Sequence, residues 1–347
     1  MDQASAEQRL ERLVEEMERR SAPHPFLSLL RKTVPFLVSA GILFYYFRGK
    51  DWPAVREALG QANLWLMVPA RVLSLLIFWG FDAYITQRLL LWFDRPFRRR
   101  DIFWIRGALY LVMLVNVNIS SGGMFLYLLR KTRLPLTKLL GIQLFRAGLS
   151  LWGFVVIFTA TLVASHYAGL DIFGKIPWRT LVIILALGWF WLFHAWTFWQ
   201  HGWRWWPINL LIRRDHALWH AFAQARPAQW LKLALLAVPL IVSNLGGLYL
   251  CAWAFGIRIP PVEFVILVPL VLSISNLPIA FGGFGTTTLA WQLLFPTHAS
   301  TQTYLAFTLA YPVVSCLTRA AIGLFSLKPA WAEWNRLSQP AAPATQS

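Results

Sequence analysis

The chain has 347 residues, of which 57% are hydrophobic and only 14% charged, and its mean hydropathy is +0.52. Soluble domains carry roughly 25% charged residues, so this composition argues against a water-soluble fold. The apolar residues come in blocks of about 20, the length that a helix needs to cross a bilayer, whereas barrel strands alternate over about 10 residues. The sequence therefore predicts an all-α integral membrane protein, built as a multi-span helical bundle.

The charge balance is strongly basic, with 32 Lys and Arg residues against 15 Asp and Glu residues and a formal net charge of +17. In a membrane protein, this excess is typical of cytoplasmic loops that follow the positive-inside rule. No segment interleaves basic and aromatic residues on a soluble module, which argues against nucleic-acid binding. Cys251 and Cys316 both lie inside apolar segments and indicate neither a disulfide framework nor a metal site.

Residues 4–20 are rich in charged helix formers and predict a solvated or surface-lying helix within a cytoplasmic, amphipathic N-terminal segment, 1–32. Residues 52–60 predict a short amphipathic segment at the membrane interface, and residues 327–347 predict a cytoplasmic polar tail. The membrane domain is expected over 33–326. Its apolar segments lie near 33–47, 63–84, 103–128, 139–163, 180–199, 231–256, 262–295 and 303–326.

Two of these segments are interrupted by residues that break a helix. Basic residues flank the segment 103–128 on both sides, which predicts that both of its ends are cytoplasmic. A re-entrant hairpin that turns at 116–123, Asn-Val-Asn-Ile-Ser-Ser-Gly-Gly, resolves this conflict. The segment 262–295 contains a Pro and Gly cluster at 275–285 and predicts a second re-entrant hairpin.

The two predicted hairpins occupy corresponding positions of two halves, about 33–163 and 180–326. Counting the crossings gives these halves opposite orientations, which is an inverted-topology repeat. Interrupted segments at equivalent positions of such a repeat indicate a transport site near the bilayer midplane. The basic loops place both termini in the cytoplasm, and the expected location is the inner (cytoplasmic) membrane.

Both interruptions also carry a resemblance to a known family. The run that begins at Gly122, Gly-Gly-Met-Phe-Leu-Tyr-Leu-Leu-Arg-Lys-Thr-Arg-Leu-Pro-Leu, precedes a helix that contains Arg146. It resembles the first signature of the lysylphosphatidylglycerol synthetase transmembrane, or flippase-like, family. The run 277–285, Leu-Pro-Ile-Ala-Phe-Gly-Gly-Phe-Gly, resembles the second signature. Order, spacing and hydropathy agree over roughly 33–326.

The resemblance implies movement of polar lipids between leaflets. Bifunctional members of the family add a soluble aminoacyltransferase domain, and nothing in this sequence corresponds to that domain, so no synthetase activity is expected. Family members often carry an acidic residue after each glycine pair. This sequence has Met124 at the first of these positions and threonines at 286–288 near the second, which affects the expected substrate and any proton coupling.

No catalytic pattern is found in the sequence. His216 and His220 lie four residues apart beside Asp215, but the His-Glu-x-x-His arrangement and a third ligand are missing, which favours a solvated helix face. Gly-x-Ser-x-Gly, Walker and paired-carboxylate patterns are absent as well. The sequence predicts no enzyme, no metal ion and no cofactor.

Buried charge is the stronger indication of a site, because an ionisable group at the bilayer centre costs about 3 kcal/mol. Arg71 lies about 12 Å inside its segment, and Asp82 faces the same side three turns later. A salt bridge to a neighbouring helix and a phosphate site both explain Arg71. Arg146 and Arg319 lie near cytoplasmic ends, where they either extend to the interface or contact a lipid phosphate.

The candidate substrate site combines these arginines with residues of the two interruptions. Asn and Ser side chains there either bind a headgroup or join helices, and the glycines permit either a tight reversal or close helix packing. A half-helix after each glycine pair is expected to direct its N-terminal dipole toward an anion. The candidate residues are Arg71, Asn116, Asn118, Ser120, Ser121, Gly122, Gly123, Arg130, Arg146, Asn276, Gly282, Gly283, Gly285 and Arg319.

The expected function is translocation of a polar or anionic lipid between leaflets without ATP hydrolysis. Three alternatives stay open: a transporter of a soluble anion, a non-transporting membrane partner of a lipid- or glycan-modifying enzyme, and a membrane-embedded enzyme. The expected partners are membrane lipids, with a second copy of the chain or a lipid-modifying enzyme as the protein partners under consideration.

Overall fold

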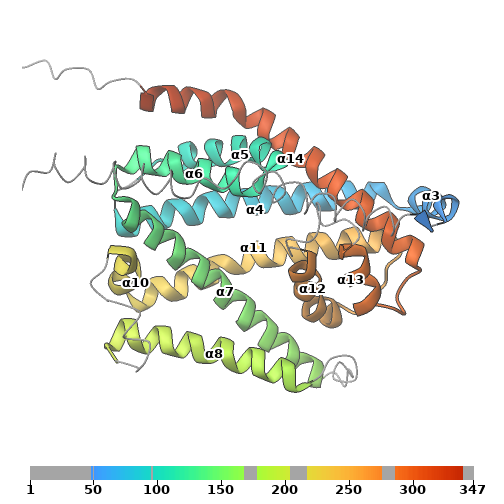
Figure 1. Cartoon of the computed structure of the whole chain (residues 1–347). Helices are drawn as coiled ribbons and strands as arrows, with labels where there is room; N and C mark the ends of the chain where they lie inside the picture. Colours follow the sequence, from blue (N-terminus) through green and yellow to red (C-terminus); the bar gives the residue numbers. More distant parts are fainter. Residues whose placement is uncertain are drawn as a thin grey trace, which may run out of the picture.

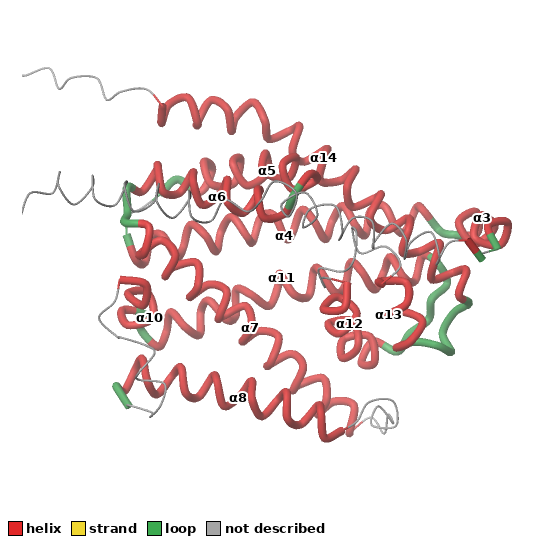
Figure 2. The backbone as a smooth tube through the Cα atoms, viewed as in Figure 1, coloured by secondary structure: helices red, strands yellow, loops and turns green. Residues whose placement is uncertain are grey.

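The computed structural model describes residues 48–49, 51–94, 97–167, 178–203, 217–275 and 286–338. Within these ranges the chain consists of helices and their connections and contains no strand, which confirms the all-α prediction (Figure 1, Figure 2). The elements are α3 Trp52–Gln61, α4 Leu64–Phe93, α5 Arg99–Val115, α6 Val117–Thr132, α7 Leu136–Tyr167, α8 Trp178–His201, η1 Ala217–Trp219, α10 His220–Gln224, α11 Pro227–Ala254, α12 Pro261–Ser275, α13 Thr286–Leu294 and α14 Thr301–Ser338. The predicted N-terminal helix and the first apolar segment lie outside the described residues.

Three of the described helices are long and apolar enough to cross a membrane, namely Leu64–Phe93, Pro227–Ala254 and Thr301–Leu337. The first of them has 30 residues. A helix of that length extends about 45 Å, more than the roughly 30 Å of hydrocarbon in a bilayer. These helices indicate a membrane protein. The inverted repeat, the number of crossings and the membrane sidedness stay predictions.

Small residues bring the long helices together in pairs. α4 and α11 lie side by side and run in opposite directions (Figure 1), and the N–H of Asn63 donates to the carbonyl of Ala254 at 2.8 Å. Gly247 of α11 packs directly on Ser74 of α4, where a Cβ atom would clash. Gly107 of α5 packs in the same way on Ser326 of α14. Such close approach is a major source of helix association in lipid, where apolarity alone gives no preference for protein contacts.

The first predicted hairpin consists of α5 and α6, but its reversal differs from the prediction. The break falls at Asn116, which has an extended backbone (φ −158°, ψ 124°) and accepts the N–H of Ile119 at 3.1 Å. Asparagine is a favoured residue at a helix start because its side chain satisfies a free backbone donor. Gly122 and Gly123 lie inside α6, so the expectation that they form the turn is wrong. Gly123 instead permits close packing on Leu109 of α5.

The second predicted hairpin is described only in its two arms, α12 and α13, which pack against each other (Figure 1). The connection between them, with the predicted site residues Asn276, Gly282, Gly283 and Gly285, lies outside the described residues. α13 is attached to α14 by the hydroxyls of Thr288 and Thr308, whose oxygens lie 2.6 Å apart.

The last helix is longer than the sequence indicates. α14 continues past 326 to Ser338, so the first part of the predicted polar tail, 327–347, is helical. Ala330 and Trp334 pack in one cluster with apolar residues of α5 and α6, and Glu333 forms an ion pair with Lys131. The ion pair between Glu333 and Lys131 therefore stabilises the packing of this part of α14 on the α5–α6 hairpin.

Glycine packing on α7 leads to a test of the fold. A Cβ atom at Gly141 would clash with the carbonyl oxygen of Leu218, whereas a Cβ at Gly148 of the same helix would meet nothing within 4 Å. We expect Gly141→Ala to lower the free energy of unfolding by about 1–3 kcal/mol, the usual cost of overpacking. Gly148→Ala should be neutral or stabilising by up to about 1 kcal/mol. Thermal unfolding of both variants in detergent measures the difference, and equal midpoints would contradict this packing.

Candidate functional site

A buried carboxylate joins three helices. Asp82 of α4 is 1% exposed. Its Oδ2 atom lies 2.6 Å from Nε of Arg106 on α5, in an ion pair whose N–H is not aimed at the oxygen. Its Oδ1 atom pairs with Arg146 of α7, which also donates to the Thr86 hydroxyl at 2.9 Å. Asp82 and Thr86 are one turn apart on one face of α4, so a single guanidinium group reaches both.

Arg71 lies eleven residues earlier on the same helix and has a different environment. It is 3% exposed, and its Nε donates to the hydroxyl of Ser315 on α14 at 2.7 Å. A second donor contacts Ser74 at 3.3 Å, and the guanidinium lies 4.6 Å from the ring centroid of Tyr311. All of these partners are neutral. No carboxylate of the described residues pairs with Arg71, so the described structure does not provide the salt bridge considered from the sequence.

Two further polar groups lie close to Arg71. Arg319, one turn after Ser315 on α14, interacts electrostatically with Arg71 and with Tyr110 of α5. Arg319 forms no ion pair with a carboxylate of the described residues. The Tyr110 hydroxyl is buried, hydrogen-bonds to no described residue, and lies within electrostatic range of both Asp82 and Arg71. Tyr110 therefore connects the surroundings of Arg71 with those of Asp82.

We refer to these residues together as the arginine cluster; it consists of Arg71, Asp82, Arg106, Tyr110, Arg146 and Arg319. The cluster contains four guanidinium groups and one carboxylate, so its formal charge is strongly positive. Like charges repel strongly where the dielectric constant is low. Bound anionic oxygen atoms relieve this repulsion, and guanidinium groups bind phosphate oxygens in pairs. The chemistry that the cluster offers is recognition of an anion, and the described side chains hold no nucleophile paired with a base.

The described contacts of the first interruption lie mainly within the α5–α6 hairpin. Asn116 is exposed and caps α6, and Ser120 is buried and donates to the carbonyl of Leu109 at 2.9 Å. Ser121 and Gly122 are exposed. The remaining member, Asn118, lies on α6, and its side chain is not among those described. These contacts support the structural role that the sequence left open for the polar residues.

Arg130 lies at the other end of α6 and outside the arginine cluster. It is exposed, and its guanidinium lies 4.7 Å from the ring centroid of Trp334 on α14. The adjacent Lys131 lies 3.3 Å from Asp101 of α5 and pairs with Glu333 of α14. This end of the hairpin is therefore attached to α14 by an ion pair and by a cation–π contact. Arg71, Arg146 and Arg319 are thus the predicted site residues that the described structure places in the cluster.

Three members of the cluster, Asp82, Arg106 and Tyr110, were not among the predicted site residues, and neither was Ser315, which binds Arg71. Arg106 lies within the apolar segment 103–128, and a charge in that position was a usable signal of a buried site. Tyr110 and Ser315 carry common helix side chains, and nothing in their spacing distinguishes them from ordinary packing residues. Only the crossing of α5 and α14 beside α4 brings them to Arg71 and Asp82.

Comparisons with known proteins add no assignment: no protein-family model matches the chain, and no curated protein is significantly similar to it. The resemblance to the flippase-like family therefore stays a proposal.

The Asp82 pairing gives a test of the site. Asp82→Asn keeps the shape of the side chain but leaves Arg106 and Arg146 without their shared counter-charge. Since loss of one partner of a buried ion pair typically costs about 3–5 kcal/mol, we expect a marked fall in the thermal unfolding midpoint. Asp51→Asn is the matched control, because Asp51 is exposed and caps α3, a role that asparagine fills equally well. An Asp82→Asn protein as stable as wild type would contradict the described pairing.

Proposed function

We propose that this chain moves an anionic or phosphate-bearing lipid headgroup between the two leaflets of a membrane, without ATP hydrolysis. The observation that carries the proposal is the pair formed by Arg71 and Arg319. Both lie on helices long and apolar enough to cross a membrane, they interact with each other as like charges, and neither pairs with a carboxylate of the described residues.

The depth of Arg71 supports movement through the protein over binding at its surface. The hydrogen bond from Asn63 to Ala254 aligns the start of α4 with the end of α11. Arg71 lies eight residues after Asn63, which corresponds to about 12 Å of helix. A headgroup bound there has left the interface, while its acyl chains can stay in the bilayer.

The cluster also supports a path with two successive binding positions. The first is formed by Arg71, Arg319 and Ser315, and the second by Arg106 and Arg146 around Asp82. Eleven residues of α4 separate Arg71 from Asp82, or about 16 Å, which is about half of the hydrocarbon thickness. At the second position a phosphate competes with Asp82 for the guanidinium groups. The phosphate is released when Arg106 and Arg146 pair with Asp82 again, so the site does not hold its substrate too tightly for transport.

The finer architecture belongs to the same proposal. It includes the inverted repeat of the halves 33–163 and 180–326, re-entry of both hairpins, and location in the inner membrane with both termini in the cytoplasm. The resemblance to the flippase-like family supports these points, as do the α5–α6 and α12–α13 pairs at corresponding positions. Alternating access would come from movement of one half against the other.

Removal of the Arg71 charge tests the proposal. Arg71→Met keeps the length of the side chain but cannot bind phosphate, so we expect leaflet exchange to slow at least about tenfold, as for a lost hydrogen bond to a charged group. The measurement is dithionite quenching of fluorescent phosphatidylglycerol in liposomes that contain the purified protein. Arg258→Met is the matched control, because Arg258 is an exposed guanidinium 4.3 Å from the ring centroid of Trp253.

Three results are distinguishable in this assay. Exchange that Arg71→Met loses and Arg258→Met keeps supports lipid translocation. Wild-type exchange no faster than in protein-free liposomes, together with uptake of a soluble anion such as phosphate that depends on Arg71, assigns the same cluster to a transporter of soluble anions. Equal exchange in wild type and Arg71→Met removes the site assignment.

Tyr110 provides a test that separates function from folding. Its hydroxyl hydrogen-bonds to no described residue, so Tyr110→Phe should leave the thermal unfolding midpoint unchanged or raise it slightly. If the hydroxyl donates to a passing phosphate oxygen, the same variant should slow leaflet exchange severalfold. Unchanged exchange together with a lowered midpoint would show that Tyr110 has only a structural role.

A further inference from the structure

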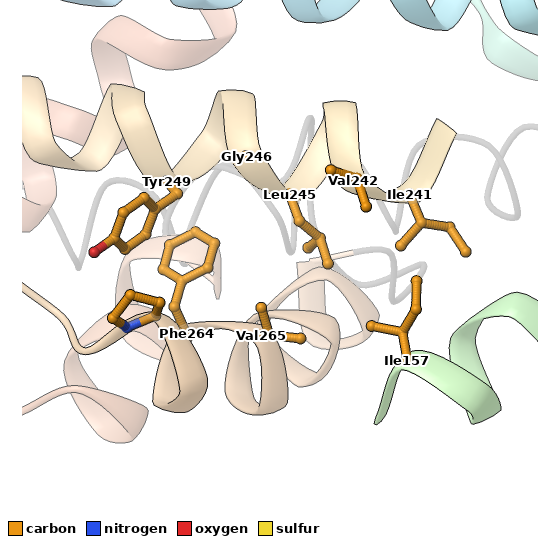
Figure 3. Close-up of a pocket in the computed structure, with 9 residues that line it drawn as sticks. Ile157, Ile241, Val242, Leu245, Gly246, Tyr249, Phe264 and Val265 are labelled. Atoms are coloured by element: carbon orange, nitrogen blue, oxygen red, sulfur yellow. The ribbon is translucent and has the colours of Figure 1, made fainter. Parts of the chain in front are cut away.

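An open groove lies on the surface of α11 opposite its contact with α4. It has a volume of about 220 Å³ and is formed by α7, α11 and α12 (Figure 3). Its lining includes Ile157, Leu245, Gly246, Tyr249, Phe264 and Val265. In the close-up, the side chains of α11 and α12 face each other across the groove, and Ile157 lies at one end.

The lining excludes a polar ligand. The one hydroxyl group in it, that of Tyr249, already donates to the carbonyl of Ile259 at 3.1 Å. The other lining side chains are aliphatic, aromatic or glycine. A sugar, phosphate or ion placed there would lose its hydration and gain no hydrogen bond in return, which costs several kcal/mol. The groove therefore fits an apolar ligand.

The position of the groove indicates where this ligand comes from. It opens on the side of α11 where Val242 is 56% exposed and Leu235 is 60% exposed. α11 is one of the helices long and apolar enough to cross a membrane, and in a membrane this surface would lie against acyl chains. The groove is thus continuous with the lipid-facing surface.

The volume decides how much of a lipid fits. Sites for small-molecule ligands usually measure about 300–1,000 Å³, whereas a cavity of about 150 Å³ holds a single benzene ring. At about 220 Å³ the groove accommodates a stretch of one hydrocarbon chain and excludes a whole lipid. We propose that the groove is a binding site for one acyl chain of a membrane phospholipid. This inference rests only on the location of the chain in a membrane and not on lipid translocation.

The groove lies at the depth of Arg71, with α11 between the two sites. Gly247 packs on Ser74, which contacts Arg71, and the adjacent Gly246 lines the groove. Because lipid tails are as apolar as the groove, binding depends on how well a chain packs and not on its hydrophobicity. The site therefore prefers a chain whose shape fills the groove.

Gly246 offers a direct way to fill the groove. A Cβ atom there would meet nothing within 4 Å, so Gly246→Leu should fold and occupy the space of the chain. Gly80→Leu is the matched control, since a Cβ at Gly80 of α4 would also meet nothing within 4 Å. Thermal unfolding checks that both variants are folded.

The experiment uses liposomes that contain the purified full chain and a phosphatidylcholine with a photoreactive diazirine in its acyl chain. After illumination, peptides are mapped by mass spectrometry. We expect saturable labelling at Ile157, Val242 and Val265 in wild type and Gly80→Leu, and loss of it in Gly246→Leu. Excess unlabelled phosphatidylcholine should reduce this labelling.

Equal labelling of Gly246→Leu and wild type at these positions would overturn the proposal, as would labelling that only follows side-chain exposure along α11. The result is independent of leaflet exchange. Arg71→Met should keep the labelling at the groove, so failure of the translocation proposal and failure of the acyl-chain proposal give different patterns.

Discussion

The described core of this protein depends on the imbalance of charge around Asp82 and Arg71. One buried carboxylate binds Arg106 and Arg146 from two further helices and so fixes how α4, α5 and α7 meet. Among the described residues, neither Arg71 nor Arg319 forms an ion pair with a carboxylate. In an apolar surrounding, such an excess of positive charge destabilises the bundle unless an anion enters it, and this constraint connects folding with the proposed function.

Small residues make this arrangement possible. Gly247 allows α11 to pack closely on Ser74 of α4, and Gly107 allows α5 to pack closely on Ser326 of α14. The same helix, α11, separates two chemically opposite sites: the arginine cluster on one side and the apolar groove on the other. A phospholipid has the same division into a charged head and apolar chains, so each site fits one part of such a molecule.

Composition and hydropathy were sufficient to predict the helical class and the starts of most described apolar helices within a few residues, whereas α4 and α14 end well after the predicted ends of their segments. They did not predict the features that depend on tertiary contacts, namely the position of a helix break and the end of a helix. Gly122 and Gly123 suggested a turn, but a capping asparagine at 116 sets the break and the glycines serve packing instead. The charged residues after 326 suggested a tail, but Lys131 and Glu333 hold it as helix. Arg71 could be identified from the sequence because a charged residue inside an apolar segment is visible in the hydropathy pattern. The role of Tyr110 depends on where α5 crosses α4, which the local sequence does not show.

The central claim is that Arg71 and Arg319 bind a lipid phosphate. Isothermal titration calorimetry of the detergent-solubilised chain with short-chain phosphatidic acid tests it most directly. We expect saturable binding of similar affinity in wild type and in Arg258→Met, binding at least about tenfold weaker in Arg71→Met, and weaker binding of the corresponding diacylglycerol, which lacks the phosphate. Equal binding of phosphatidic acid by wild type and Arg71→Met would contradict the account.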